Sequence, residues 1–164
     1  KVLGELASQD RVFASQLKIR IVGSCSVEVL KSIREQGLTQ NLDALGYQDH
    51  EQVARHQQSA QVLLLAVNRV PAARGIVTGK IFEYMQAKRP VLAIGPTDGD
   101  LAAILKETRC GEIVDFADEA GMKKVVLKLY HRFTKGDLSV SSTGTEKYHR
   151  RNLTRELFEM LKEM

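Results

Sequence analysis

Short apolar runs alternate along the chain with segments whose apolar residues recur every three or four positions. The apolar runs predict strands, at 17–22, 42–45, 61–67, 91–94 and 112–114. The periodic segments predict helices, at 27–35, 51–59, 80–87, 100–108 and 119–133. Strands and helices that alternate in this way are typical of βαβ units and a parallel sheet. We therefore predict an α/β fold with a Rossmann-like parallel sheet flanked by helices.

The run "QVLLLAV" at 61–67 is apolar at almost every position, which predicts a strand buried on both faces of the sheet. Open α/β sheets bind ligands at the edge where their parallel strands end. Glycines follow three of the predicted strands, at Gly23, Gly46 and Gly95, and the segment 68–80 follows a fourth. We expect a ligand site at that edge.

The end of the chain has a different pattern. Residues 136–147 are polar and rich in Gly, Ser and Thr, which predicts a linker after a domain at 1–135. Residues 148–164 place Leu153, Leu157 and Leu161 four apart, which predicts an amphipathic helix. We expect this helix to pack either on this domain or, preferably, on an absent one. The chain opens without Met in the helix-like stretch "KVLGELASQD", so we expect a fragment of a longer protein.

Composition narrows the class of protein. Aromatic residues make up 5% of the 164, with no Trp, which argues against a single-stranded nucleic-acid binder. Cys25 and Cys110 lie far apart and the four histidines have no metal-ligand spacing, which favours a reduced, cytoplasmic protein without a metal site. The net charge of +4 and the basic segment 122–135 indicate a solvated surface or, alternatively, peripheral contact with an anionic membrane.

Candidate chemistry lies in "GIVTGKIFEYMQ", at 75–86. The stretch "GIVTGK" is one residue too short for a Walker phosphate loop, and Ile81 stands where that motif needs a hydroxyl. A helix N-terminus still attracts anions, and Thr78, Gly79 and Lys80 would converge there on a phosphate. Glu83 lies one turn further on the same face, where a carboxylate can accept hydrogen bonds from a ribose diol. The spacing thus indicates either a nucleotide site or an ordinary Lys–Glu surface pair.

The block "TGKIFEYMQAKRPVLAIGPTDGDLAAIL" resembles the C-terminal donor-binding domain of GT-B glycosyltransferases of group 1, the family 4-like class. The preceding order of strand, glycine, "GY" loop, helix and apolar strand is also similar, so the resemblance covers about 17–114. It implies transfer of a sugar from a nucleotide-diphosphate donor to a hydroxyl acceptor, for instance in polysaccharide biosynthesis. It also implies that the domain's first strand and an N-terminal acceptor domain lie outside this chain, which alone would be inactive.

The resemblance assigns roles to particular residues. Glu83 would hold the ribose hydroxyls, while Lys80 and the amides around Thr78 and Gly79 would face the diphosphate. The nucleotide pocket would further be lined by Gly23 and the loop at Gly46 and Tyr47. Donor binding would need no metal, and a catalytic base would belong to the absent half.

Two departures keep alternatives open. The family's first glutamate, eight residues before Glu83, is replaced by Gly75, and the family's upstream diphosphate-binding Arg and Lys follow a strand that this chain lacks. The alternatives are a sugar-nucleotide epimerase of GT-B fold and a noncatalytic α/β binding module with a degenerate site.

Overall fold

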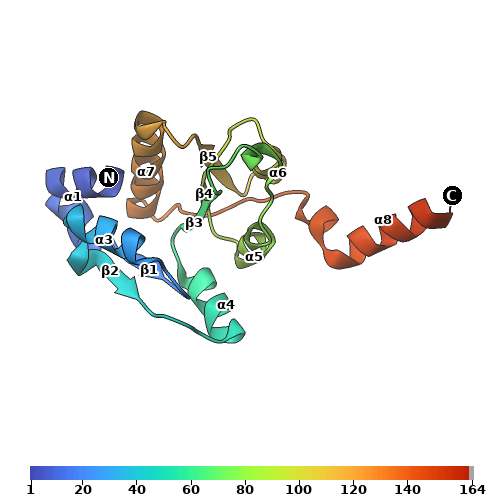
Figure 1. Ribbon diagram of the computed structural model, residues 1–164, viewed down its shortest axis with the longest axis horizontal. Coiled ribbons are helices and arrows are strands. Elements are labelled where there is room, and N and C mark those ends of the chain that lie inside the picture. Colours follow the sequence, from blue (N-terminus) through green and yellow to red (C-terminus); the bar gives the residue numbers. More distant parts are fainter. Residues whose placement is uncertain (163–164) are drawn as a thin grey trace. The chain divides into compact units, whose positions relative to one another are not determined.

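The computed structural model describes residues 1–162 and divides the chain into two compact units, 1–56 and the part from residue 57 onward (Figure 1). The division falls inside helix α4 (His50–Ser59). It therefore lies within the segment 1–135 that the sequence analysis assigned to one domain.

The first unit holds two short parallel strands, three complete α-helices and the first part of α4. Its elements are α1 (Val2–Gln9), α2 (Arg11–Gln16), β1 (Ile19–Ile21), α3 (Val27–Glu35) and β2 (Leu42–Ala44). Asp10 starts α2, because its carboxylate accepts the amide hydrogens of Val12 and Phe13 at 2.8 and 3.0 Å. Strands β1 and β2 pair in parallel, and the loops after them leave the same edge.

The second unit is built on a three-stranded parallel sheet in the order β3-β4-β5. The strands are β3 (Leu63–Ala66), β4 (Val91–Ile94) and β5 (Gly111–Val114), joined by the crossover helices α5 (Lys80–Ala87) and α6 (Asp100–Thr108). These are two parallel βαβ units in succession. The described strands thus form two parallel sheets flanked by helices, as expected for the α/β class.

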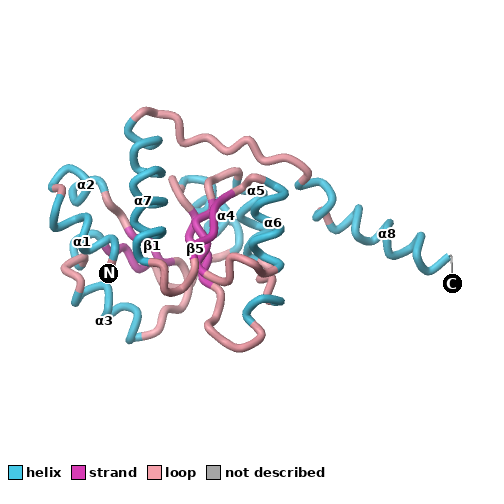
Figure 2. The backbone as a smooth tube through the Cα atoms, turned by 90° about the horizontal axis from the view of Figure 1, so that it is seen from above, coloured by secondary structure: helices cyan, strands magenta, loops and turns pink. Residues whose placement is uncertain are grey.

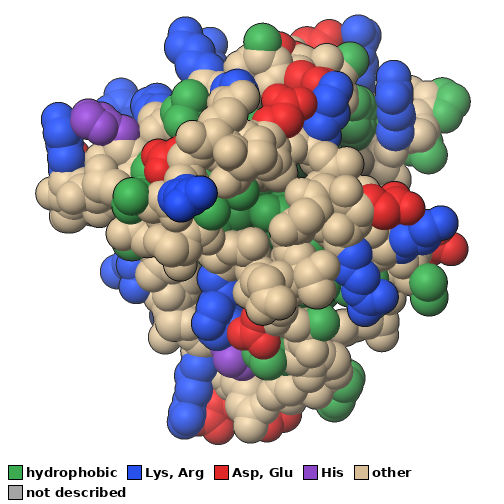
Figure 3. Space-filling view, turned by 90° about the vertical axis from the view of Figure 1, so that its left-hand side faces the viewer, with side chains coloured by type: hydrophobic (Ala, Val, Ile, Leu, Met, Phe, Trp, Pro, Cys, Tyr) green, Lys and Arg blue, Asp and Glu red, His purple; other side chains and the backbone are tan. Residues whose placement is uncertain are grey.

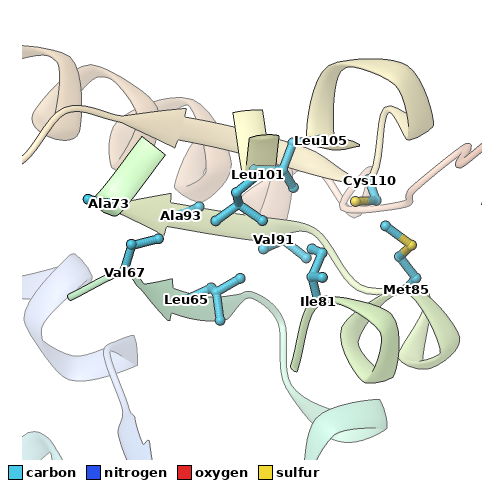
Figure 4. Close-up of a cluster of buried hydrophobic side chains, with 10 residues drawn as sticks. All are labelled: Leu65, Val67, Ala73, Ile81, Met85, Val91, Ala93, Leu101, Leu105 and Cys110. Atoms are coloured by element: carbon cyan, nitrogen blue, oxygen red, sulfur yellow. The ribbon is translucent and has the colours of Figure 1, made fainter. Parts of the chain in front are cut away.

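The crossover helices and the sheet enclose the main hydrophobic core (Figure 4). Ile81 and Met85 of α5 meet Val91 and Ala93 of β4, and α6 contributes Leu101 and Leu105. Ile81 and Ala93 are fully buried. Ile81 directly follows Lys80 in sequence and is fixed in the core, so the first turn of α5 has a defined position.

The prediction that 61–67 is buried on both faces was wrong. Leu63 and Leu65 are buried, but Leu64 between them is 57% exposed. The reason is that the second hydrophobic cluster contains Leu92 of β4, Val114 of β5 and Leu129 of α7 (Glu119–Thr134) but no residue of β3, which is an edge strand of the sheet. An unbroken apolar run does not distinguish a central strand from this edge strand.

Beyond β5 the chain forms α7 (Glu119–Thr134), a loop and α8 (Arg150–Lys162). We call residues 136–149, which run from the end of α7 past α6 to α8, the strap (Figure 2). The strap ends in a short 3₁₀ turn, η3 (Thr145–Tyr148). No described residue of α8 is buried, so α8 does not pack on the described core. Packing of this helix on an absent domain stays a prediction, and residues 163–164 of the predicted helix lie outside the described residues.

Candidate functional site

The first turn of α5 carries most of the residues expected to bind a donor. Gly79 is the N-cap, and no side chain caps the helix there. The carbonyls of Thr78 and Gly79 accept the amides of Ile81 and Phe82 at 3.1 and 3.2 Å. The hydroxyl oxygen of Thr78 is buried and has no hydrogen-bond partner. A buried hydroxyl without a partner costs free energy, and at an uncapped helix N-terminus an anionic oxygen would satisfy it.

Lys80 and Glu83 are both exposed on this turn, as their spacing predicted. Within the described residues they form no ion pair with each other. One oxygen of Glu83 instead accepts a hydrogen bond from the side-chain amide of Gln57, at 3.0 Å. The surface pair that the spacing left open is therefore not formed. Lys80 is the first residue of the helix, and the Glu83 carboxylate is held by Gln57.

The loops that follow β3 and β4 are packed together at the sheet edge. The 3₁₀ turn η2 (Ala73–Gly75) precedes α5, and a Cβ added to Gly99 would lie 2.6 Å from the carbonyl oxygen of Arg74. Arg74 also forms an ion pair with Asp98 at 2.9 Å. Gly99 is the N-cap of α6, again without a side-chain cap. Two uncapped helix N-termini are thus tied to one another through these loops.

A tyrosine fixes the first turn of α5 to the neighbouring strand. The hydroxyl of Tyr84 donates to the carbonyl oxygen of Leu64 at 3.4 Å. Burial raises the pKa of Tyr84, and the negative charge of Glu83 raises it further. The phenol is therefore a neutral anchor beside Glu83 at physiological pH.

The other two expected site residues lie in the first unit. The amide of Gly23, after β1, donates to the carbonyl of Gly46, after β2, at 2.7 Å. Both glycines have positive φ, at 96° and 65°, which a residue with a side chain rarely adopts. Tyr47 follows directly and is 91% exposed. The structure brings together Gly23 and the Gly46–Tyr47 loop, and it separately brings together Thr78, Gly79, Lys80 and Glu83.

Sequence reasoning missed Gln57, Arg69 and Arg74. Gln57 contacts Glu83 from 26 residues away, a separation that no local pattern reveals. The guanidinium of Arg69 lies 5.8 Å from the ring centre of Phe116, which places a cation where the loops after β3 and β5 meet. Arg69 and Arg74 could have been found from the sequence, because both are cations in the segment 68–79, which was already expected at the ligand-binding edge of the sheet.

Other kinds of site find less support. In the part of the chain that the structure describes, His, Cys, Asp and Glu side chains form no group of three that could hold a metal ion. Among the same residues, no helix is both long and apolar enough to cross a membrane. On the face drawn in Figure 3, Lys and Arg side chains are scattered among acidic and uncharged ones.

Comparisons with known proteins show the family and the fold of the chain. The family model for glycosyl transferases group 1 matches residues 3–132. No curated protein matches the chain. Among solved structures, the chain is similar to WaaG, a glycosyltransferase involved in lipopolysaccharide biosynthesis. The identity is 17% and the TM-score 0.62, over 80% of this chain and 34% of WaaG.

A second similar structure is sucrose-phosphate synthase from Thermosynechococcus elongatus. The identity is 18% and the TM-score 0.60, over 97% of this chain and 42% of the synthase. The chain thus spans less than half the length of either neighbour. The likeness to both structures shows a Rossmann-like fold of GT-B type. The chain belongs to the glycosyl transferases of group 1.

Proposed function

We propose that this chain binds the nucleotide-diphosphate sugar donor of a glycosyltransferase that passes the sugar to a hydroxyl acceptor. The observation that carries the proposal is the first turn of α5, where an uncapped N-terminus, an unpartnered hydroxyl, a cation and a carboxylate occur within six residues, 78–83. Family membership and the fold of both structural neighbours support the same reaction class.

The diphosphate half of the donor would lie at the start of α5. The helix amides, the Thr78 hydroxyl and the Lys80 ammonium all favour negative charge at this point. As the bond to the sugar breaks, charge grows on the departing diphosphate. Groups already aimed at that charge would lower the barrier to transfer. This arrangement supplies positive charge without a metal, so we propose metal-independent donor binding.

The ribose would lie beside Glu83. A carboxylate accepts hydrogen bonds from two vicinal hydroxyls, and the bond from Gln57 leaves acceptor capacity on Glu83. Such charge-assisted hydrogen bonds are worth about 1.5–3 kcal/mol each. Lys80 and Glu83 would thus recognise different halves of the same ligand.

A noncatalytic binding module is the second candidate, and Gly75 is the observation that favours it. This glycine is exposed, has no positive φ, and an added Cβ would meet nothing within 4 Å. Nothing in its surroundings requires glycine, so the missing glutamate is not explained by packing. A module of this kind would bind a nucleotide but transfer no sugar.

The test is an NMR titration of this chain with UDP, GDP, ADP and CMP, and separately with inorganic pyrophosphate. We expect saturable shifts at residues 78–83 with one nucleoside diphosphate, unchanged by EDTA. Glu83→Ala should weaken that nucleotide at least about tenfold, because it removes the ribose contact, and leave pyrophosphate binding unaltered. Lys80→Ala should weaken both ligands.

The matched control is Gln86→Ala, which changes an exposed residue one turn further along α5 and should bind like the wild type. Equal weakening by Gln86→Ala and Glu83→Ala would contradict the assigned ribose contact. A transfer assay on a protein that also carries the expected acceptor domain separates a transferase from a binding module, which would transfer no sugar.

A further inference from the structure

The strap connects the end of the chain to the first turn of α5. Its first part is tied to α7, because Arg132 donates to the carbonyl oxygens of Asp137 and Ser139 at 3.1 and 2.7 Å. Further along, the amide of Thr143 donates to the carbonyl of Thr108 at the end of α6, at 3.0 Å. The strap is therefore held at successive points along its course rather than loose.

The strap ends in a contact with both crossover helices. The hydroxyl of Tyr148 donates to the carboxylate of Glu107 on α6 at 2.9 Å, and Lys147 pairs with the same carboxylate. The ring of Tyr148 packs against Phe82, with ring centres 5.7 Å apart. Phe82 lies between Lys80 and Glu83 in the first turn of α5, so Tyr148 touches the turn that the proposed donor would occupy.

Besides the burial of Ile81 and the bond from Tyr84 to Leu64, two further contacts hold this turn from other elements. Gln57 of α4 holds the Glu83 carboxylate, and Tyr148 of the strap packs on the adjacent residue, Phe82. We propose that Tyr148 is a positioning residue, which fixes the first turn of α5 so that Lys80 and Glu83 meet the diphosphate and ribose of one nucleotide. This inference rests on the proposed function of α5.

Replacing the ring should misplace the turn. An aromatic pair contributes about 0.5–1.5 kcal/mol, so Tyr148→Ala should weaken binding of the preferred nucleoside diphosphate roughly two- to tenfold. Tyr148→Phe keeps the ring and loses only the hydroxyl, so its affinity should stay close to that of the wild type. Isothermal titration with the nucleoside diphosphate found above measures both affinities.

Leu138→Ala is the matched control for general loosening of the strap. Leu138 packs against the second hydrophobic cluster, around Leu92, Val114 and Leu129. The substitution should lower the unfolding midpoint and leave nucleotide affinity unchanged. The proposal is overturned if Tyr148→Ala binds like the wild type, or if Leu138→Ala weakens binding as much as Tyr148→Ala does.

Amide hydrogen exchange in nucleotide-free protein separates failure of this inference from failure of the proposed function. If no nucleotide binds the wild type, the proposed function fails, but exchange still reports on α5. Faster exchange of the α5 amides in Tyr148→Ala, and not in Tyr148→Phe or Leu138→Ala, supports the positioning role. Equal α5 exchange in Tyr148→Ala and the wild type overturns it.

Discussion

Single residues decide how the strap responds to pH. Hydrogen bonds from Lys147 and Tyr148 hold the pKa of Glu107 below its ordinary 4.5. The hydrogen bond between Lys147 and Glu107 is in turn the main cause that raises the pKa of Lys147 above its ordinary 10.5. A carboxylate whose pKa is lower in the folded than in the unfolded protein stabilises the fold at any pH above its unfolded-state pKa. That contribution is lost as pH falls through the lowered, folded-state pKa. A lysine with a raised pKa contributes below its unfolded value and loses that contribution at higher pH.

Burial, and then the bond to Glu107, raise the pKa of Tyr148 above its ordinary 10.0. We therefore expect the strap contact to be complete between about pH 4.5 and 10 and to weaken outside this window. Urea unfolding at a series of pH values measures this. Glu107→Gln should be less stable than the wild type at pH 7, and the difference should shrink as pH falls below 4.5. If the difference in stability between Glu107→Gln and the wild type stays constant down to about pH 2.5, the charge of the carboxylate contributes nothing to the stability of the fold.

The individual helices show what a sequence pattern can and cannot predict. The predicted bounds of α3, α5 and α6 match the structure, because apolar periodicity and end signals agree there. Helix α1 lies within the stretch 1–10 that was interpreted as helix-like, whereas α2 has no counterpart among the predicted elements. For the candidate site, the i,i+3 spacing predicted that Lys80 and Glu83 share a turn. It could not predict the contacts of Gln57 and Tyr148, which come from segments distant in sequence.

Helices α5 and α6 end in the same unusual way, which sets up a stability prediction. Their C-caps, Lys88 and Arg109, have φ of 53° and 52°, a left-handed conformation that glycine adopts without strain. A glycine at these positions would remove about 1–2 kcal/mol of left-handed backbone strain, which exceeds the entropic cost of glycine, about 0.5–1 kcal/mol. Lys88→Gly and Arg109→Gly should each raise the free energy of unfolding by about 0.5–1 kcal/mol, measured by urea denaturation.

The control for this prediction is Ala103→Gly, an exposed change inside α6. A glycine in a helix interior costs about 1 kcal/mol, so this variant should be less stable than the wild type. The left-handed strain would be refuted if all three glycine variants lost stability to the same extent.

At the scale of the whole molecule, α8 is set apart from the rest of the second unit. Its apolar side chains Leu153, Leu157, Phe158, Met160 and Leu161 are 46–60% exposed. In contrast, Val140 and Tyr148 of the strap pack against the main core. Hydrophobic stabilisation scales with the apolar area removed from water, so the strap should stabilise this unit and α8 should not.

A chain ending at His149 should therefore keep the free energy of unfolding to within about 0.5 kcal/mol, because it retains Tyr148 and none of the described residues of α8 is buried. Circular dichroism during urea unfolding measures the stability. Before unfolding, the helical signal of the truncated chain should be lower than that of the full chain by the contribution of α8. A chain ending at Lys135 is the comparison. It removes Leu138, Val140 and Tyr148 from the two hydrophobic clusters and should be clearly less stable. If both truncations cost the same, the stabilising contacts would belong to α8, and the strap could not act as the support of α5.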